Sequence, residues 1–360
     1  MTVQHLKTGN ASSGASANSI GALRYLLALL IVQHHTNGLT GSDLPMLLRA
    51  DTVVYAFFAL SGFFAWQSYG RSISSWRFIR HRLLRLLPAY WTVVLFSALG
   101  LSALSELSLS DYFTSAGFWR YLCANGVLLN FLQPELPGVF GDHLITAVNG
   151  SLWYVKMEVA FTFLVPVVGK GRTLVFRLLE QCLPQAWHNR DTVSRYGSVV
   201  FWLVLSSAVF SLRFLCGEGQ LFSYLCDMLM FLFGLFASQL WLTRKSNFAF
   251  SRICFFCLII LGIFVWARDV MLHPYLYFLL STLVIGSLII CFISTGFAAF
   301  LNRNNMTYSL YLCHFPLIQL AVSLTSSPIA TYALEVILIL LSTLLLYYGV
   351  ERRMVLSRRS

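Results

Sequence analysis

Charged side chains are scarce in this sequence. The 360 residues include 25 Lys and Arg and 14 Asp and Glu, so charged residues make up 11% of the chain. A soluble chain usually carries about 25%, and so few charges cannot cover the surface of a water-soluble globule. Disordered, collagen-like and coiled-coil chains are excluded too, because they do not contain 30 Phe, 16 Tyr and 9 Trp.

Apolar residues take the place of the missing charges and make up 58% of the sequence. A membrane-spanning helix needs about 20 consecutive, mostly apolar residues, and the chain offers about ten such stretches. We therefore predict an all-α fold, a polytopic integral membrane bundle of about ten transmembrane helices. The predicted spans are centred near Ala28, Ala59, Val94, Phe161, Val204, Phe231, Ile260, Leu283, Leu312 and Leu340.

The sequence shows no internal repeat and no linker that would separate a second domain. Residues 1–18 are polar and precede the first apolar run. A cleaved signal peptide has its small-residue cleavage site after the apolar run, so we expect this run to be retained as the first span. We expect a polar N-terminal tail at 1–18, a transmembrane domain at 19–350 and a basic cytoplasmic tail at 351–360. The weaker apolar stretch from Tyr121 to Leu132 is expected to form a re-entrant or interfacial helix.

Basic residues are unevenly distributed along the chain. If the N-terminus is cytoplasmic, most of the 25 Lys and Arg fall on cytoplasmic segments, while the opposite loops are acidic. This pattern follows the positive-inside rule and predicts that both termini are cytoplasmic. The net charge of +11 is expected to attract anionic membrane lipids or an anionic ligand. No basic surface with interleaved aromatic residues stands clear of the membrane, so we expect no nucleic-acid partner.

Two ionisable residues, Arg24 and His35, lie within the first apolar run. Their spacing of eleven residues places both side chains within about 20° of one helix face and about 16 Å apart along the axis. His34 points about 100° away from that face. Charges inside a bilayer cost several kcal/mol and often serve a function. A structural interpretation stays open, in which Arg24 extends to a lipid phosphate and His35 makes an interhelical hydrogen bond.

A second basic group follows the second span, in FIRHRLLRLLPAYW. Arg82 and Arg85 are three residues apart, so they project from one helix face at the predicted cytoplasmic boundary. Guanidinium groups suit phosphates because they form paired hydrogen bonds. The same arginines also anchor the helix as the positive-inside rule requires.

Polar residues recur in two later spans. The segment SLWYVKMEVAFTFLVP places Glu158 at a depth comparable with that of His35. A carboxylate at that depth needs a partner, and Lys156, Arg24 or His35 would serve. A contact between Glu158 and His35 would orient the imidazole. In TYSLYLCHFPLIQL, His314 lies close to a proline, and packing is its simpler interpretation.

Several other residues have the chemistry of functional groups but no supporting pattern. Asp227 and Glu335 lie within apolar runs, and the sequence assigns neither a specific role. The eight Cys do not indicate a disulfide framework, since several lie in apolar runs as small hydrophobic residues. Cys254 and Cys257 have the spacing of metal ligands but lack a second ligand pair, so we expect no metal.

Taken together and in order, these segments resemble the acyltransferase type 3 family, bacterial inner-membrane proteins that O-acylate sugars of exported glycans. The resemblance covers Leu23 to Arg352 and is carried by LRYLLALLIVQHH, FFALSGFF, FIRHRLLRLLPAYW, SLWYVKMEVAF, YSLYLCHFPL and YYGVERR. The family's motif residues correspond to Arg24 and His35, Arg82 and Arg85, Trp153 and Glu158, and Tyr311 and His314.

Three positions depart from the family pattern. Tyr55 stands where the family often has an acidic residue, Tyr154 where a serine is common, and Arg353 where a proline is common. None of these changes removes a residue that the family's chemistry needs, although Tyr55 bears on how the acceptor is held.

The resemblance implies an O-acetyltransferase of the bacterial inner membrane. It would move an acetyl group from cytoplasmic acetyl-CoA, a co-substrate and not a bound cofactor, to a sugar hydroxyl. The acceptor would be an exported, lipid-linked or nascent surface glycan of the O-antigen or capsule type. The sugar, its hydroxyl and the length of the acyl chain are open.

The resemblance and the helix geometry together suggest a role for each site residue. His35 is the expected general base, and Glu158 orients it or holds the sugar. The CoA phosphates are expected at Arg24, Arg82 and Arg85. Further contacts to the acceptor or the oxyanion are expected from Ser61, Trp153, Tyr311 and His314.

Two alternatives remain at this stage. An acyl-enzyme on His35 or Ser61 could replace direct transfer. Buried Arg, His and Glu also mark transporters, so a flippase of a lipid-linked sugar is the main alternative function.

Overall fold

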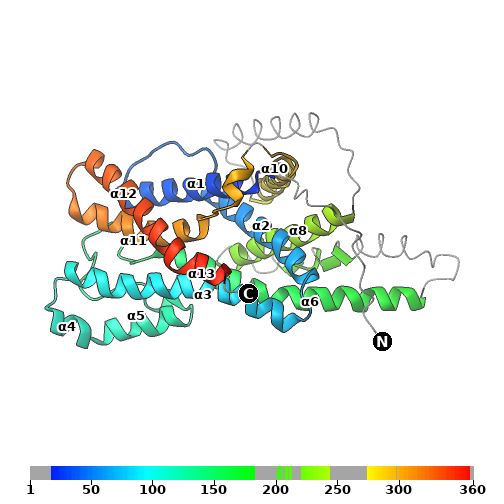
Figure 1. The fold of residues 1–360 in the computed structure, drawn as a ribbon, viewed down its shortest axis with the longest axis horizontal. Coiled ribbons are helices and arrows are strands. Elements are labelled where there is room, and N and C mark those ends of the chain that lie inside the picture. Colours follow the sequence, from blue (N-terminus) through cyan, green and yellow to red (C-terminus); the bar gives the residue numbers. More distant parts are fainter. Residues whose placement is uncertain are drawn as a thin grey trace.

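A computed structural model describes residues 18–182, 201–202, 204–205, 207–209, 211–212, 220–243, 274–296 and 298–356 (Figure 1). All regular secondary structure in these residues is helical. The first half of the chain forms α1 (Ile20–Thr40), α2 (Ala50–Gly70), α3 (Ser75–Gly100), η1 (Leu101–Leu104), α4 (Leu109–Thr114), α5 (Ala116–Gly126), η2 (Asn130–Leu132), η3 (Gly150–Leu152) and α6 (Trp153–Cys182). The second half forms α8 (Gln220–Thr243), α10 (Pro274–Ser294), η5 (Ala299–Asn302), α11 (Thr307–Leu324), α12 (Pro328–Leu346), the π-helical η6 (Tyr347–Glu351) and α13 (Arg352–Leu356).

The predicted all-α membrane protein is confirmed in outline. In the described part of the chain, 5 helical segments are long and apolar enough to cross a membrane: Ser75–Leu104, Gly150–Leu178, Leu276–Ser294, Thr307–Leu324 and Pro328–Met354. Helices α1 and α2 have 21 residues each but carry polar side chains that lower their hydropathy.

The other predicted spans are described less completely. The span near Phe231 coincides with α8, whose Ser223–Gln239 portion is a shorter apolar helix. The span near Val204 is described only in pieces, and the one near Ile260 lies outside the described residues.

The centre of the bundle is the crossing of α2 and α8, where the two backbones touch. A methyl group at Gly62 would overlap the carbonyl group of Phe231, and one at Gly234 would overlap the carbonyl of Ala59. Small residues allow the two backbones to come this close. The resulting van der Waals packing stabilises the helix pair in lipid, where the hydrophobic effect between helices is weak. Around the crossing, a large apolar cluster includes buried residues of α1, α2, α6, α8 and α10.

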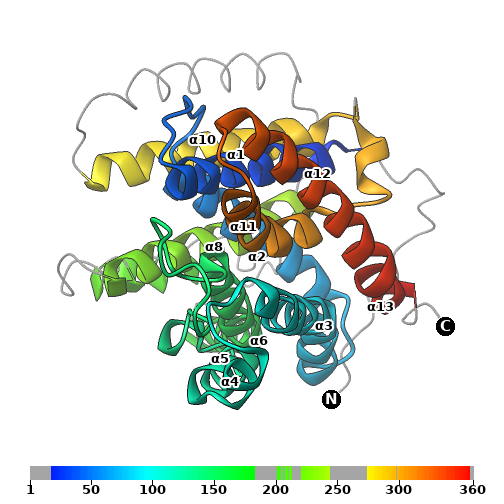
Figure 2. The same cartoon turned by 90° about the vertical axis from the view of Figure 1, so that its left-hand side faces the viewer.

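Polar contacts at both ends fix the position of α1. At its start, the Ser19 amide donates to the Phe292 carbonyl at 2.8 Å, and the Gly21 amide donates to Asn302 Oδ1 at 2.7 Å. Near its end, the Thr36 hydroxyl donates to Glu335 of α12 at 3.1 Å. Figure 2 shows α11 beside α1 in the middle of the bundle, and α11 also contacts α3. These contacts hold the Arg24–His35 face of α1 toward the bundle interior.

Helix α11 continues through Pro316, which has no amide hydrogen for the carbonyl of Leu312 one turn earlier. The side chain of Asn149 donates to that carbonyl at 2.9 Å and replaces the missing hydrogen bond. The loop before η3 is thereby tied to α11 close to His314.

The sequence analysis expected one helix from Tyr121 to Leu132, and this expectation is wrong. Helix α5 ends at Gly126, and Leu128 takes a positive φ of 66° before the short η2 begins. The Tyr90 hydroxyl of α3 donates to the Asn125 carbonyl at 2.8 Å. The local turn and this contact with α3 end the helix where composition alone suggested that it would continue.

The crossing of α2 and α8 predicts the effect of adding one methyl group there. Gly62→Ala is expected to lower the free energy of unfolding by about 1–3 kcal/mol, because the overlap forces the helices apart. Thermal unfolding of the purified protein in detergent measures this change. Gly171→Ala on α6 is the control, because a methyl group at Gly171 meets nothing within 4 Å. Equal melting temperatures for both variants would contradict the close approach.

Candidate functional site

Two cavities lie along the shared face of α1. The first, here called the arginine cavity, is lined by residues that include Arg24, Ser61, Arg82, Arg85, Tyr154 and Glu158. The second, the histidine cavity, is lined by residues that include His34, His35, Tyr55, Trp153 and Asp227. Tyr311 lines both cavities, so they adjoin across its side chain. Arg24 and His35 thus each line one of two adjoining cavities, and His34 lines the second cavity as well.

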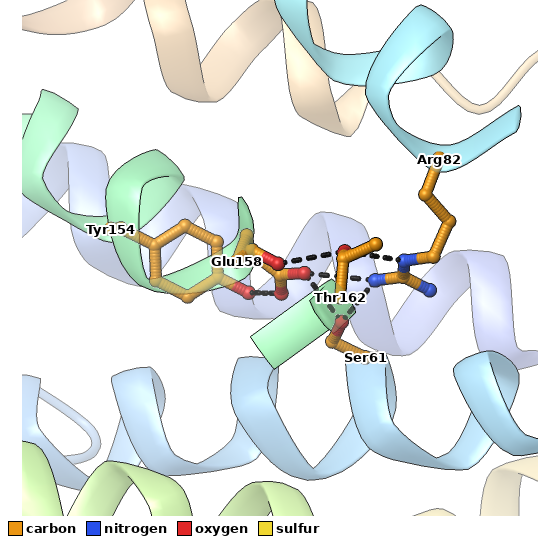
Figure 3. A network of polar contacts seen from close by, with 5 residues as sticks. All are labelled: Ser61, Arg82, Tyr154, Glu158 and Thr162. Atoms are coloured by element: carbon orange, nitrogen blue, oxygen red, sulfur yellow. Dashed lines mark hydrogen bonds and ion pairs between the residues drawn. The ribbon is translucent and has the colours of Figure 1, made fainter. Parts of the chain in front are cut away.

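A network of hydrogen bonds around Glu158 forms one wall of the arginine cavity (Figure 3). Arg82 Nη2 donates to Glu158 Oε2 and to Ser61 Oγ, both at 2.9 Å, and its Nε donates to Thr162 Oγ1 at 3.1 Å. The Ser61 hydroxyl donates to Glu158 Oε2 at 2.6 Å, and the Tyr154 hydroxyl donates to Glu158 Oε1 at 2.6 Å. The network joins α2, α3 and α6.

This network answers the question of which group pairs with Glu158. The Arg82 and Glu158 side chains are only 14% and 6% exposed, so the ion pair is largely removed from water. Both carboxylate oxygens accept hydrogen bonds from these partners, and His35 is not among them. The proposed contact between Glu158 and His35 is therefore not formed. Lys156 lies over the rings of Phe131 and Tyr224 instead.

Positive charge exceeds negative charge on the walls of the arginine cavity. Arg24 stacks on the Phe64 ring at 4.6 Å, and Arg85 is exposed. No described carboxylate lies within ion-pair distance of either residue, and Glu351, which accepts a hydrogen bond from Ser309, acts on both at longer range. Arg24, which lies inside the protein without a paired carboxylate, therefore attracts an anion strongly, and the exposed Arg85 adds a second positive charge at the same cavity.

His35 makes its closest contact with another histidine. Its Nδ1 lies 2.7 Å from Nε2 of His314, and the rings stack with centroids 4.9 Å apart. His314 is fully buried on α11, and Phe315 packs edge-on against His35 at 5.0 Å. His314 lines neither cavity, so its contact with the histidine cavity runs through His35.

The contact between the histidines constrains where their protons reside. One ring nitrogen must donate and the other must accept, because two protonated nitrogens would repel each other. If His35 Nδ1 donates to His314 Nε2, then Nε2 of His35 carries a lone pair and can accept a proton. This tautomer gives His35 the form that a general base requires.

Two of the four residues expected to contact the acceptor or the oxyanion, Tyr311 and Ser61, already donate their hydroxyl protons to other groups. The Tyr311 hydroxyl donates to the Ser151 carbonyl at 2.7 Å, and the Ser61 hydroxyl donates to Glu158. Neither proton points to a developing negative charge in this state. Trp153, in contrast, lines the histidine cavity.

Sequence reasoning missed Tyr154 and Thr162 as partners of the site. Both lie four residues from Glu158, on the same face of α6, and this helical spacing is the signal that could have found them. Tyr154 fills the position where the resembling family commonly has serine, and its hydroxyl still reaches the carboxylate.

In the parts of the chain that the structure describes, no three His, Cys, Asp or Glu residues gather as metal ligands would. Cys254 and Cys257 lie outside these parts.

A family model described as an acyltransferase domain matches residues 18–352, nearly the whole chain. No curated protein and no solved structure matches the chain.

The buried ion pair predicts a large effect of removing one partner. Glu158→Ala leaves the Arg82 charge buried without its counterion, which is expected to cost about 3–5 kcal/mol of folding free energy. Thermal unfolding in detergent measures the loss. Asp51→Ala is the matched control, since the Arg49–Asp51 pair is half exposed and is expected to contribute only about 0–1 kcal/mol. A melting temperature for Glu158→Ala as high as that of the control would contradict this ranking.

Proposed function

The chain belongs to the acyltransferase type 3 family, and on that premise we propose that this membrane acyltransferase is an O-acetyltransferase. It transfers the acetyl group of cytoplasmic acetyl-CoA to a sugar hydroxyl. The acceptor is an exported, lipid-linked surface glycan of the O-antigen or capsule type.

One observation supports this proposal most strongly, namely the pair of cavities that adjoin at Tyr311. One cavity has three arginines and a single carboxylate on its walls, which suits the phosphates of CoA. The other contains an imidazole held in a defined orientation by a second histidine, which suits proton transfer.

The distance along α1 fits the shape of the donor. Arg24 and His35 are separated by eleven residues, or about 16 Å of helix. The extended pantetheine arm of CoA has a comparable reach. With the nucleotide held at the arginines, the thioester arrives at Tyr311 and His35.

The reaction follows from this placement. His35 Nε2 removes the proton from the sugar hydroxyl while the hydroxyl oxygen attacks the thioester carbonyl. The tetrahedral intermediate collapses as the carbon–sulfur bond breaks, and the CoA thiolate takes the proton back from His35. The products are the acetyl ester and free CoA. His314 holds His35 in the required tautomer, and Glu158 keeps Arg82 in position for the donor.

The same proposal places the protein in a bacterial inner membrane. Both termini and Arg85 face the cytoplasm, following the bias of basic residues, and the histidine cavity faces outward. About ten spans complete the bundle. The donor then never leaves the cytoplasmic side, and the acceptor never enters the cytoplasm.

His35→Ala is expected to lower kcat by about 10²-fold or more, because the general base is lost. The measurement is release of CoA thiol from acetyl-CoA in the presence of a lipid-linked glycan. Acetyl-CoA binding, followed by calorimetry, should change little. His143→Ala is the control, since His143 lines neither cavity. Transfer at the wild-type rate by His35→Ala would refute the assignment.

Arg85→Ala is expected to raise KM for acetyl-CoA about 10- to 150-fold and to leave KM for the acceptor unchanged. The reason is the loss of a charged contact to phosphate, worth about 1.5–3 kcal/mol. Arg80→Ala is the matched control, as Arg80 is exposed on the same helix and lines neither cavity. The family match does not favour the transporter considered above; if the wild-type protein binds no acetyl-CoA, the proposed donor is wrong and the O-acetyltransferase proposal fails.

A further inference from the structure

The histidine cavity contains a carboxylate that lacks a partner. Asp227 of α8 lines this cavity and is 4% exposed. No hydrogen bond or ion pair joins it to any described residue. Burial of a carboxylate without a partner is costly, so a hydrogen-bond donor bound in the cavity would stabilise Asp227.

Four large aromatic side chains also line the histidine cavity. Trp153, Tyr55, Tyr277 and Tyr311 come from four different helices and surround a volume of about 440 Å³. This volume lies within the range of small-molecule sites, about 300–1,000 Å³. The negative face of an aromatic ring attracts the weakly positive C–H groups of a sugar ring. The aromatic rings can pack against the C–H faces of a pyranose. The carboxylate of Asp227, which has no hydrogen bond to a described residue, can accept hydrogen bonds from the hydroxyl groups at the edge of the sugar.

The charges on these walls argue against an anionic occupant. The cation among the lining residues, Arg49, pairs with Asp51 at 3.1 Å and lies over the Tyr277 ring at 4.5 Å. Its charge is therefore already balanced, while Asp227 adds a carboxylate without a counterion. The arginine cavity has the opposite balance, so the two cavities select ligands of different charge.

We propose that the histidine cavity is the acceptor subsite and takes an uncharged pyranose, with Asp227 accepting hydrogen bonds from neighbouring ring hydroxyls. This inference rests on the acetyl transfer proposed above. Asp227 and His35 line the same cavity, so a sugar held by the carboxylate presents a further hydroxyl to the base. A site that hydrogen-bonds hydroxyl groups rejects analogues in which those groups are replaced.

The test uses the full-length protein with acetyl-CoA and soluble acceptors. Neutral methyl glycosides of glucose, galactose and rhamnose are compared with the methyl glycosides of glucuronic and galacturonic acid, and CoA thiol release is measured. At least one neutral glycoside is expected to be acetylated, with kcat/KM at least tenfold above that of its uronic acid analogue. Equal use of both, or use of no neutral glycoside, would overturn the proposal.

Asp227→Asn keeps the size of the side chain and removes its charge. It is expected to raise KM for the neutral glycoside about tenfold or more, as the loss of a charged hydrogen bond predicts, with KM for acetyl-CoA within about twofold. Ser238→Ala is the control, because Ser238 is buried on the same helix but lines neither cavity. An unchanged acceptor KM for Asp227→Asn would count against the assignment.

Ser223→Trp gives an independent test if Asp227→Asn fails to fold. Ser223 is exposed and lines the histidine cavity one turn before Asp227, so the larger side chain should block the acceptor and leave acetyl-CoA binding intact. Full activity of this variant would show that the acceptor binds elsewhere. Failure of the wild-type protein to bind acetyl-CoA would instead refute the proposed function, so the two failures are distinguishable.

Discussion

The buried ion pair between Arg82 and Glu158 organises the arginine cavity. In lipid or a dry protein interior neither charge is tolerated alone. The pair joins α3 to α6, and the Ser61 hydroxyl adds α2 to the same network. The arginine that faces the cavity is thus held in one orientation before any anion arrives, and such preorganisation lowers the cost of binding.

Opposite charge balance in two adjoining cavities offers a way to join reactants from two sides of a membrane. Arg24 and Arg85 have no carboxylate within ion-pair distance, whereas Arg49 in the other cavity is balanced by Asp51. Tyr311 lines both cavities, and its hydroxyl is anchored to the backbone at Ser151. A donor and an acceptor of different charge would each enter their own cavity and meet at this side chain.

Much of this arrangement can be read from the sequence, because helical periodicity fixes the relative directions of residues on one helix. The scarcity of charge and the long apolar runs indicate an all-α membrane protein. The spacing of Arg24 and His35 predicts their common face on α1, and the spacing of Arg82 and Arg85 predicts neighbouring guanidinium groups. Both patterns agree with the cavities of the structure.

Contacts between helices required the tertiary structure. His35 and His314 are 279 residues apart in sequence, yet their rings stack. Glu158 bonds Arg82, which was not among the partners that the sequence suggested for this carboxylate. The sequence pattern assigned no role to Asp227, but the structure places it in the wall of the same cavity as His35. Periodicity specifies which residues share a face of one helix. Which faces meet depends on packing across the whole bundle, such as the approach of α2 to α8 at Gly62 and Gly234.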